Sequence, residues 1–265
     1  MPDRMFEHPR LTAIYDALEG DRSDLDVYVS AAQDVDARDV LDIGCGTGAL
    51  ALLLASRGIA VTALDPAAGS LEVARRKPGA EQIRWVQGYA GDLPALQVDL
   101  VTMTGNVAQA IVDDDDWSLT LARIHDALRP DGCLVFETRI PVRTAWTEWN
   151  RRDSFAVREI PGVGRVESWL ETTEVNGPVV SFRWTYVFVS DGEVLTSDST
   201  LRFRERDEVE SALVEHGFTI REVRDAPDRP GREMIFYARK ASASASSVAP
   251  QPIREFRRFP DRSCP

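Results

Sequence analysis

Three glycines and two aspartates in the first quarter of the chain have types and spacing that could bind a nucleoside. Residues 40–48 read Val-Leu-Asp-Ile-Gly-Cys-Gly-Thr-Gly, and a second apolar run, residues 59–64, ends in Asp65. Glycine lacks a Cβ, so a ligand can lie directly against the backbone. The N–H groups that open a following helix carry partial positive charge. With Asp65 placed to accept hydrogen bonds from two ribose hydroxyls, the pattern predicts a nucleoside site where two parallel strands end.

The charge of Asp42 distinguishes between the nucleosides that such a loop could hold. The spacing is Gly-x-Gly-x-Gly, and the dinucleotide fingerprint would need Ala49 as its third small residue. A carboxylate two residues before the first glycine would repel a pyrophosphate but would attract an ammonium group and a sulfonium. S-adenosylmethionine is therefore favoured over NAD, and an NAD oxidoreductase is the least expected function.

The motif in residues 42–48 resembles the first motif of the class I S-adenosylmethionine-dependent methyltransferases at every position. The resemblance continues through residues 64–66, 93–94, 98–101 and 128–135 and ends at residues 216–218, so it covers about residues 10–240. It implies a doubly wound α/β domain over residues 1–240 with a seven-stranded, Rossmann-like sheet. It also implies that the cofactor contacts Asp42, Gly44, Cys45, Gly46, Gly48, Asp65, Pro66, Thr104 and Asn106.

The loop at residues 88–94 departs from the family pattern. The family often has Gly-Asp-Ala here, with the aspartate accepting a hydrogen bond from the adenine amino group. In this chain Tyr89 stands at that position and Asp92 lies three residues later. Either Asp92 makes the adenine contact, or the backbone of Ala90 and Gly91 reads the ring with Tyr89 or Asp92 nearby.

Alternating strands and helices between residues 39 and 139 would position these side chains. Further strands are predicted at residues 82–87, 98–104 and 132–138, and helices are predicted to begin near Thr47 and Ala68. Residues 5–33 have helical spacing and, by the resemblance, form a lid over the cofactor. Tyr15 and Tyr28 could then contact the methionine end or the acceptor, although aromatic side chains more often pack in a core.

Residues 165–203 have a period of two, which predicts three antiparallel strands at about residues 166–175, 182–188 and 194–203. They follow the predicted fifth strand. By the resemblance, residues 144–203 form a small β insertion that caps the acceptor or makes a dimer contact, so a monomer and a homodimer both remain open. A helix at residues 205–216 and a hairpin of residues 218–223 and 234–239 complete the domain.

Candidate acceptor residues stand where the fourth and fifth strands end. Glu137 and Arg139 have the same side-chain parity and are the candidates for catalysis, and Trp146 and Trp149 follow on a short helical stretch. With Asn106 they could bind an aromatic or amine-bearing acceptor. The alternative is that Glu137 pairs with Arg139 and the tryptophans belong to the core. The three histidines, His8, His125 and His216, are better explained by structural or surface roles.

The acidic run Asp113–Asp116 precedes an amphipathic helix and is expected to cap it rather than to bind a metal. Adjacent carboxylates point in different directions, so no metal site is predicted. Three scattered cysteines, Cys45, Cys133 and Cys264, also argue against a zinc site or a disulfide framework.

The net charge of −12 over 265 residues argues against a nucleic-acid substrate, because phosphate binding needs a basic surface. The apolar runs are too short to span a membrane, and the N-terminal residues do not resemble a secretion signal. A cytoplasmic protein with no membrane partner is expected. Residues 241–265 lack periodicity and are expected to be a disordered tail.

Together these features predict an S-adenosylmethionine-dependent methyltransferase that acts on the O, N or C atom of a small molecule. An RNA or protein methyltransferase is the alternative, and it would need a basic patch around residues 137–149. A catalytically silent S-adenosylmethionine-binding protein is a further alternative, to which only the substitution at Tyr89 points.

Overall fold

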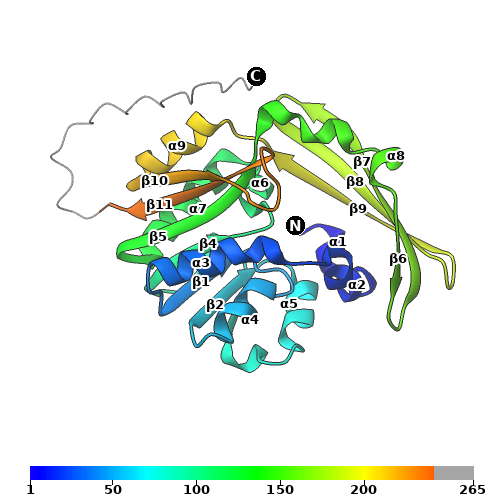
Figure 1. The fold of residues 1–265 in the computed structure, drawn as a ribbon, viewed down its shortest axis with the longest axis horizontal. Helices are drawn as coiled ribbons and strands as arrows, with labels where there is room; N and C mark the ends of the chain where they lie inside the picture. Colours follow the sequence, from blue (N-terminus) through cyan, green and yellow to red (C-terminus); the bar gives the residue numbers. More distant parts are fainter. Residues whose placement is uncertain (242–265) are drawn as a thin grey trace, which may run out of the picture.

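The computed structural model describes residues 1–241, so the predicted tail lies outside the described residues except for Ala241. Its main sheet has seven strands in the order β10-β11-β5-β4-β1-β2-β3 (Figure 1). Only β11 runs antiparallel to its neighbours. The strands are β1 (Asp39–Ile43), β2 (Ala60–Asp65), β3 (Arg84–Gln87), β4 (Val98–Met103), β5 (Leu128–Arg139), β10 (Phe218–Asp225) and β11 (Glu233–Lys240). The predicted α/β fold is confirmed.

Helices cover both faces of this sheet because alternate strand residues are apolar on both sides. Side chains of α3 (Asp26–Asp34), α4 (Ala49–Ala55) and α5 (Ala68–Arg75) share one buried cluster with Val40, Leu100 and Val135. On the other face, α6 (Val107–Ala110), α7 (Asp114–Ala127) and α9 (Arg206–Glu215) pack around Leu41, Val101 and Leu134. The helix after β1 begins at Ala49 rather than near Thr47, because Gly48 still adopts a left-handed turn conformation.

A second sheet contains four antiparallel strands, one more than the sequence predicted. They are β6 (Ala156–Ile160), β7 (Gly164–Asn176), β8 (Val179–Phe188) and β9 (Glu193–Arg202), paired in that order. The missed strand, β6, is a short edge strand with three consecutive exposed residues, so it lacks the alternation that identifies its neighbours.

The N-terminal helices lie between the two sheets (Figure 1). The helix α2 (Pro9–Glu19) packs Leu11 and Ile14 against Tyr186 and Phe188 of the four-stranded sheet. The preceding α1 (Arg4–Glu7) joins the four-stranded sheet to a helix of the main domain: the Met5 N–H donates to Ser197 Oγ of β9 at 2.9 Å. On its other side the Glu7 carboxylate accepts from the N–H groups of Ala68 and Gly69 at the start of α5.

Candidate cofactor and acceptor site

The glycine loop after β1 folds as its sequence requires. Gly44, Gly46 and Gly48 all have positive φ angles, of 71°, 53° and 80°. The N–H of Gly44 donates to the carbonyl of Leu64 at 2.8 Å, which ties the loop to the end of β2. A Cβ on Gly44 would overlap Val107, whereas a Cβ on Gly46 would meet nothing within 4 Å. The loop is therefore packed against protein at Gly44 and open at Gly46, as a site that receives a ligand against its backbone must be.

Asp65, at the end of β2, holds this loop in place. Its Oδ2 accepts from the Gly46 N–H at 2.7 Å and its Oδ1 accepts from the Ala67 N–H at 2.8 Å. Burial raises the pKa of Asp65, and the two backbone donors oppose that rise. Each carboxylate oxygen has a second lone pair, so Asp65 can still accept from a ligand hydroxyl.

Asp42 is the least satisfied carboxylate near the loop. The residue is 1 % exposed, and its Oδ1 accepts from Thr102 Oγ1 at 2.8 Å. Its Oδ2 is buried and has no hydrogen-bond partner within residues 1–241. Burial raises the pKa of Asp42 to about 7, and the nearby charge of Asp65 adds to the rise. A buried carboxylate without a partner is costly, and a cationic ligand group would remove that cost.

In the loop of residues 88–94, the side chain of Tyr89 faces solvent and the side chain of Asp92 binds the backbone. Tyr89 is 55 % exposed. Asp92 Oδ2 accepts from the Tyr89 N–H at 2.9 Å, so the carboxylate closes the turn η3 (Ala90–Asp92). Ala90 is buried, and a Cβ on Gly88 would lie 2.8 Å from Asp92. This geometry leaves both sequence alternatives standing, since Asp92 Oδ1 and the Ala90 and Gly91 backbone all remain candidates for the adenine contact.

The ends of β4 and β5 carry a polar cluster that includes three of the predicted acceptor residues, Asn106, Glu137 and Arg139. Asn106, with a φ of 61°, donates its backbone N–H to Glu137 Oε1 at 2.6 Å and its Nδ2 to Glu233 Oε1 at 3.1 Å. Arg229 donates to the same Glu233 oxygen at 2.8 Å. Burial raises the pKa of Glu137 to about 8, with the charge of Glu233 adding to the rise. The carboxylate nearest to Arg139 is Glu233, at 3.7 Å, so the sequence-based alternative of a Glu137–Arg139 pair is wrong within the described residues.

Comparison with known proteins identifies the domain to which these features belong. Residues 40–132 match a family described as a methyltransferase domain. A cypemycin N-terminal methyltransferase from Streptomyces is 31 % identical over 115 residues, which are 43 % of this chain and 47 % of the relative. A ubiquinone/menaquinone biosynthesis C-methyltransferase from Rubrivivax gelatinosus is 30 % identical over 142 residues, 52 % of this chain and 53 % of the relative. The chain spans about half the length of the curated relatives it matches.

Solved structures of the same fold extend over most of the chain. An S-adenosylmethionine-dependent methyltransferase from Clostridium acetobutylicum superimposes with a TM-score of 0.70 at 17 % identity, covering 88 % of this chain and 98 % of that one. An amino pentose methyltransferase from Micromonospora echinaspora, solved with S-adenosylmethionine bound, gives 0.67 at 23 % identity, covering 86 % and 97 %. Residues 40–132 thus form a methyltransferase domain, and the fold over most of the chain is that of the class I S-adenosylmethionine-dependent methyltransferases. S-adenosylmethionine is the cofactor, and the open backbone at Gly46 and the unpartnered Asp42 Oδ2 fit it.

In this methyltransferase the two predicted tryptophans pack against the four-stranded sheet. Trp146 meets the ring of Phe203 edge-on at 4.6 Å between centroids, and Trp149 meets Phe182 at 4.8 Å. The Arg139 guanidinium lies 5.7 Å from the Trp149 ring, and Arg139 also donates to Gln109 Oε1 at 3.3 Å. Trp149 thus links the β5 end of the main sheet to the four-stranded sheet.

The N-terminal segment contacts the glycine loop through side chains that the sequence analysis did not single out. Asp16 on α2 accepts from Thr47 Oγ1 at 2.5 Å and pairs with Lys77 at 2.5 Å. Tyr15 itself packs edge-on against Phe6, and burial followed by the charge of Glu19 raises its pKa. Arg22, after α2, lies close enough to lower the pKa of Asp42 by its charge.

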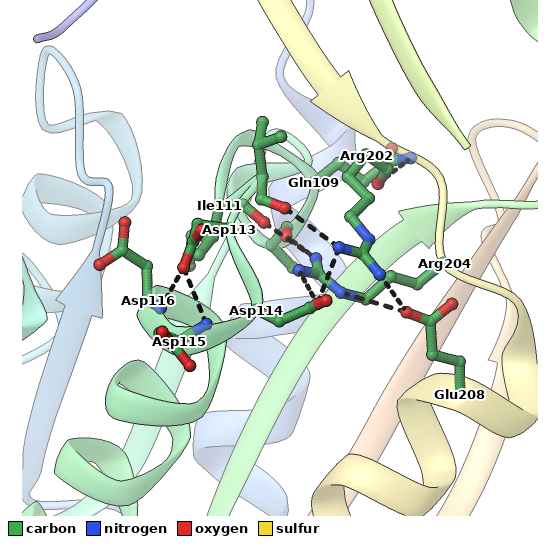
Figure 2. A network of polar contacts seen from close by, with 11 residues as sticks. Gln109, Ile111, Asp113, Asp114, Asp115, Asp116, Arg202, Arg204 and Glu208 are labelled. Carbon is green, nitrogen blue, oxygen red and sulfur yellow. Dashed lines mark hydrogen bonds and ion pairs between the residues drawn. The ribbon is translucent and has the colours of Figure 1, made fainter. Parts of the chain in front are cut away.

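The acidic run of the methyltransferase serves the structure (Figure 2). Asp113 caps α7 by accepting from the N–H groups of Asp115 and Asp116 at 2.8 and 3.2 Å. Asp114 turns the other way and pairs with Arg202 at 2.8 Å and Arg204 at 3.5 Å. Residues 1–241 contain no group of three or more histidine, cysteine, aspartate or glutamate side chains that could hold a metal ion.

The described part of the chain also has no helix long and apolar enough to cross a membrane.

The candidate site residues that the sequence analysis missed are Glu233, Arg229 and Arg22. Glu233 left one signal: it is a charged residue at the start of an apolar strand, with the same parity as the buried Ile235.

Proposed function

We propose that the protein transfers the methyl group of S-adenosylmethionine to a small-molecule acceptor bound between the ends of β4 and β5 and the four-stranded cap. The observation that carries the proposal is the buried Asp42 Oδ2, which has no partner in residues 1–241 and lies beside a loop that is open at Gly46. A ligand with both a ribose and an ammonium group would satisfy Asp65 and Asp42 together.

The remaining predicted cofactor residues follow from this placement. Cys45, Gly48 and Pro66 flank the glycine loop and the end of β2, and the adenine would lie on the Ala90–Gly91 backbone with Tyr89 or Asp92 beside it. Thr104 and Asn106 follow β4, near the reacting methyl group. Tyr15 belongs to the lid formed by α2. We assign residues 1–240 to one methyltransferase domain, in which residues 144–203 form the cap.

For methyl transfer, the main task of the protein is to align the acceptor atom with the methyl carbon of the cofactor. The sulfonium already activates the methyl carbon for an in-line displacement, and good alignment can contribute about 7–11 kcal/mol. A general base is needed only if the acceptor is a hydroxyl or a protonated amine. The partly buried cap aromatics Trp146 and Trp149 and the polar Asn106, Glu137 and Arg139 offer the mixture of apolar walls and few polar groups that small-molecule sites have.

A small acceptor is supported by charge and by one relative. The net charge of −12 disfavours a polyanionic substrate. The Micromonospora relative, as an amino pentose methyltransferase, acts on a small sugar. A nucleic-acid or protein substrate would need a broad binding surface near Glu137 and Trp149, where the four-stranded sheet lies instead.

Ligand-dependent thermal unfolding tests the proposal. S-adenosylmethionine and S-adenosylhomocysteine should raise the unfolding temperature, because a ligand at a hundred times its dissociation constant stabilises by about 2.7 kcal/mol. NAD should produce no shift. Stabilisation by NAD, or by none of the three, would overturn the cofactor assignment, and transfer of labelled methyl into a pool of metabolites tests the acceptor class.

A further inference from the structure

A cavity of about 30 Å³ lies where β4 and β5 end. Its lining includes no residue of the glycine loop, and its walls come from five segments: η1 (Ser23–Leu25), α3, the turn after β4, the end of β5, and the β10–β11 hairpin. The polar lining residues are Asp24, Tyr28, Asn106, Glu137, Asp228, Arg229 and Glu233.

Two polar atoms in this lining are buried without a partner. Tyr28 is 2 % exposed and Asn106 is 3 % exposed, and neither Tyr28 Oη nor Asn106 Oδ1 has a hydrogen bond within the described residues. The amide orientation of Asn106 is fixed, because its Nδ2 faces the Glu233 carboxylate, which can only accept when ionised. The cavity therefore presents an acceptor, Asn106 Oδ1, that is left without a donor. Such atoms are rare in folded proteins and point to a missing ligand group or water.

The charges around the cavity are unevenly compensated. Arg229 pairs with Glu233 and Asp228, Arg139 lies 3.7 Å from Glu233, and Arg22 pairs with Asp24. Glu137 has no ion-pair partner in the part of the chain that the structure describes; one oxygen accepts from the Asn106 N–H. Burial raises its pKa to about 8, which shows that the neighbouring groups do not offset the cost of its charge.

An unpaired carboxylate beside an orphaned amide oxygen suits a ligand that brings several N–H donors and a positive charge. An alcohol would bring one donor and no charge, and a carboxylate would bring no donor for Asn106 Oδ1. We propose that this cavity binds the amino group of the methyl acceptor and that Glu137 takes a proton from that nitrogen. This inference rests on the proposed function and narrows its acceptor to amines.

The step balances without a further reactant. The acceptor enters as an ammonium ion and gives one proton to the Glu137 carboxylate. The freed nitrogen lone pair forms the new N–C bond while the S–C bond of the donor breaks and leaves its electron pair on sulfur. The product is a methylated ammonium ion and a neutral thioether, and the Glu137 proton then passes to solvent. Because burial raises the pKa of the Glu137 carboxyl above its usual range, its carboxylate is a stronger base for this proton than an exposed glutamate.

The first experiment compares acceptor classes with the full-length protein. Isotopically labelled S-adenosylmethionine is incubated with a pool of primary amines and, separately, with a pool of the corresponding alcohols, and S-adenosylhomocysteine binding is measured in parallel. Label in the amine pool alone is expected. Label in the alcohol pool, or in neither pool while S-adenosylhomocysteine binds, would overturn the amine inference and leave the cofactor assignment intact. Failure of S-adenosylhomocysteine to bind would instead remove the proposed function.

The second experiment tests Glu137 with a matched control. Glu137→Gln keeps an oxygen for the Asn106 N–H but cannot take a proton, and we expect it to lower the rate of amine methylation at least about 100-fold. Its S-adenosylhomocysteine affinity should be unchanged. Glu72→Gln, an exposed glutamate on α5, should leave both quantities unchanged.

Dependence on pH separates proton transfer from a structural role. The wild-type kcat/KM should rise with pH as Glu137 loses its proton. The negative charges of Glu233, Asp228 and Asp24 disfavour this ionisation. The positive charges of Arg139, Arg229 and Arg22 favour it. The residual activity of Glu137→Gln should instead follow the ionisation of the free amine in solution, so its rise should be displaced to higher pH, toward the pKa of the acceptor. If Glu137→Gln unfolds, Glu137→Asp, which retains a carboxylate, should keep part of the rate and the pH rise. A fully active Glu137→Gln, or an unchanged pH profile, would overturn the role of Glu137.

Discussion

Two groups of carboxylates in this methyltransferase differ in how their charges are met. In the run Asp113–Asp116, Asp113 accepts from two backbone N–H groups and Asp114, although 67 % exposed, pairs with Arg202 and Arg204 (Figure 2). Asp42 and Glu137 stand alone at strand ends and are almost fully buried, and neither has an ion-pair partner within residues 1–241. Two acids of the dense run are thus met by groups of the protein itself, whereas each isolated carboxylate has an oxygen for which no ion-pair partner is found within residues 1–241.

The difference shows which acids are available for a ligand. Adjacent acids at a helix start stabilise that helix and have little charge left unmet. A lone acid inside a pocket costs folding free energy unless something binds it. Asp42 lies in β1 just before the glycine loop, and Glu137 lines the cavity where β5 ends. The following predictions test this contrast in order of expected effect.

The largest effect should come from the pH dependence of stability at Asp42. A carboxyl whose pKa is raised to about 7 in the folded protein binds its proton more tightly there than in the unfolded chain. Its stabilising contribution is therefore present below pH 4 and is lost as pH rises through 7, by at most on the order of 4 kcal/mol. Asp42→Asn should lose this slope in urea unfolding between pH 4 and 8, and it should bind S-adenosylhomocysteine more weakly. Equal slopes for the variant and the wild type would show that Asp42 is already satisfied.

The arginine side of the acidic run should show the next effect, and on stability alone. Arg204 is 3 % exposed, donates to the carbonyl of Ile111 at 2.9 Å and lies 4.9 Å from the Trp117 ring. Arg204→Ala leaves buried carbonyls without a donor, which should cost about 3 kcal/mol of unfolding free energy. Calorimetry of the unliganded protein measures this loss. The affinity for S-adenosylhomocysteine should stay unchanged. A loss of affinity in this variant would show that the residues paired with the acidic run also contribute to ligand binding, which would contradict the distinction between the two groups of carboxylates.

Asp65→Ala should affect ligand affinity more than any change in the acidic run. It removes the carboxylate that would accept from the ribose and frees the Gly46 N–H that positions the loop. The lost charge-assisted hydrogen bond to the ribose, at about 1.5–3 kcal/mol, predicts a loss of about 10- to 100-fold in S-adenosylhomocysteine affinity. Titration calorimetry provides the measurement. An affinity equal to that of the wild type would contradict the placement of the ribose.

The cofactor side of the site could be predicted from the sequence because its parts are close in the chain. Asp42, the glycines and Asp65 lie within 24 consecutive residues, 42–65, and a strand–turn–helix pattern fixes their relative positions. The sheet was predictable for the same reason: each βαβ unit is local and its handedness is constrained.

The acceptor side was only half predictable because its contacts join distant segments. Asn106 and Glu233 are 127 residues apart in sequence, and no periodicity relates them. The sequence analysis placed Glu137 and Arg139 together at the end of the fifth strand. Its alternative to an acceptor site was an ion pair between these two residues. In the structure, β11 pairs with β5 and brings Glu233, not Glu137, to Arg139. Strand β6 was missed because its exposed residues carry no alternating pattern.

Asp113→Ala should have the smallest effect on stability and none on ligand affinity. It serves as a control because its own loss of unfolding free energy can still be measured. Loss of an N-cap aspartate typically costs about 1 kcal/mol, and the capped N–H groups of Asp115 and Asp116 are exposed enough to bind water instead. Urea unfolding should detect that loss while titration with S-adenosylhomocysteine shows no change. If Asp113→Ala weakened the ligand as much as Asp65→Ala, acids that are satisfied by backbone would be as important for binding as unmet ones, and the distinction between the two groups would fail.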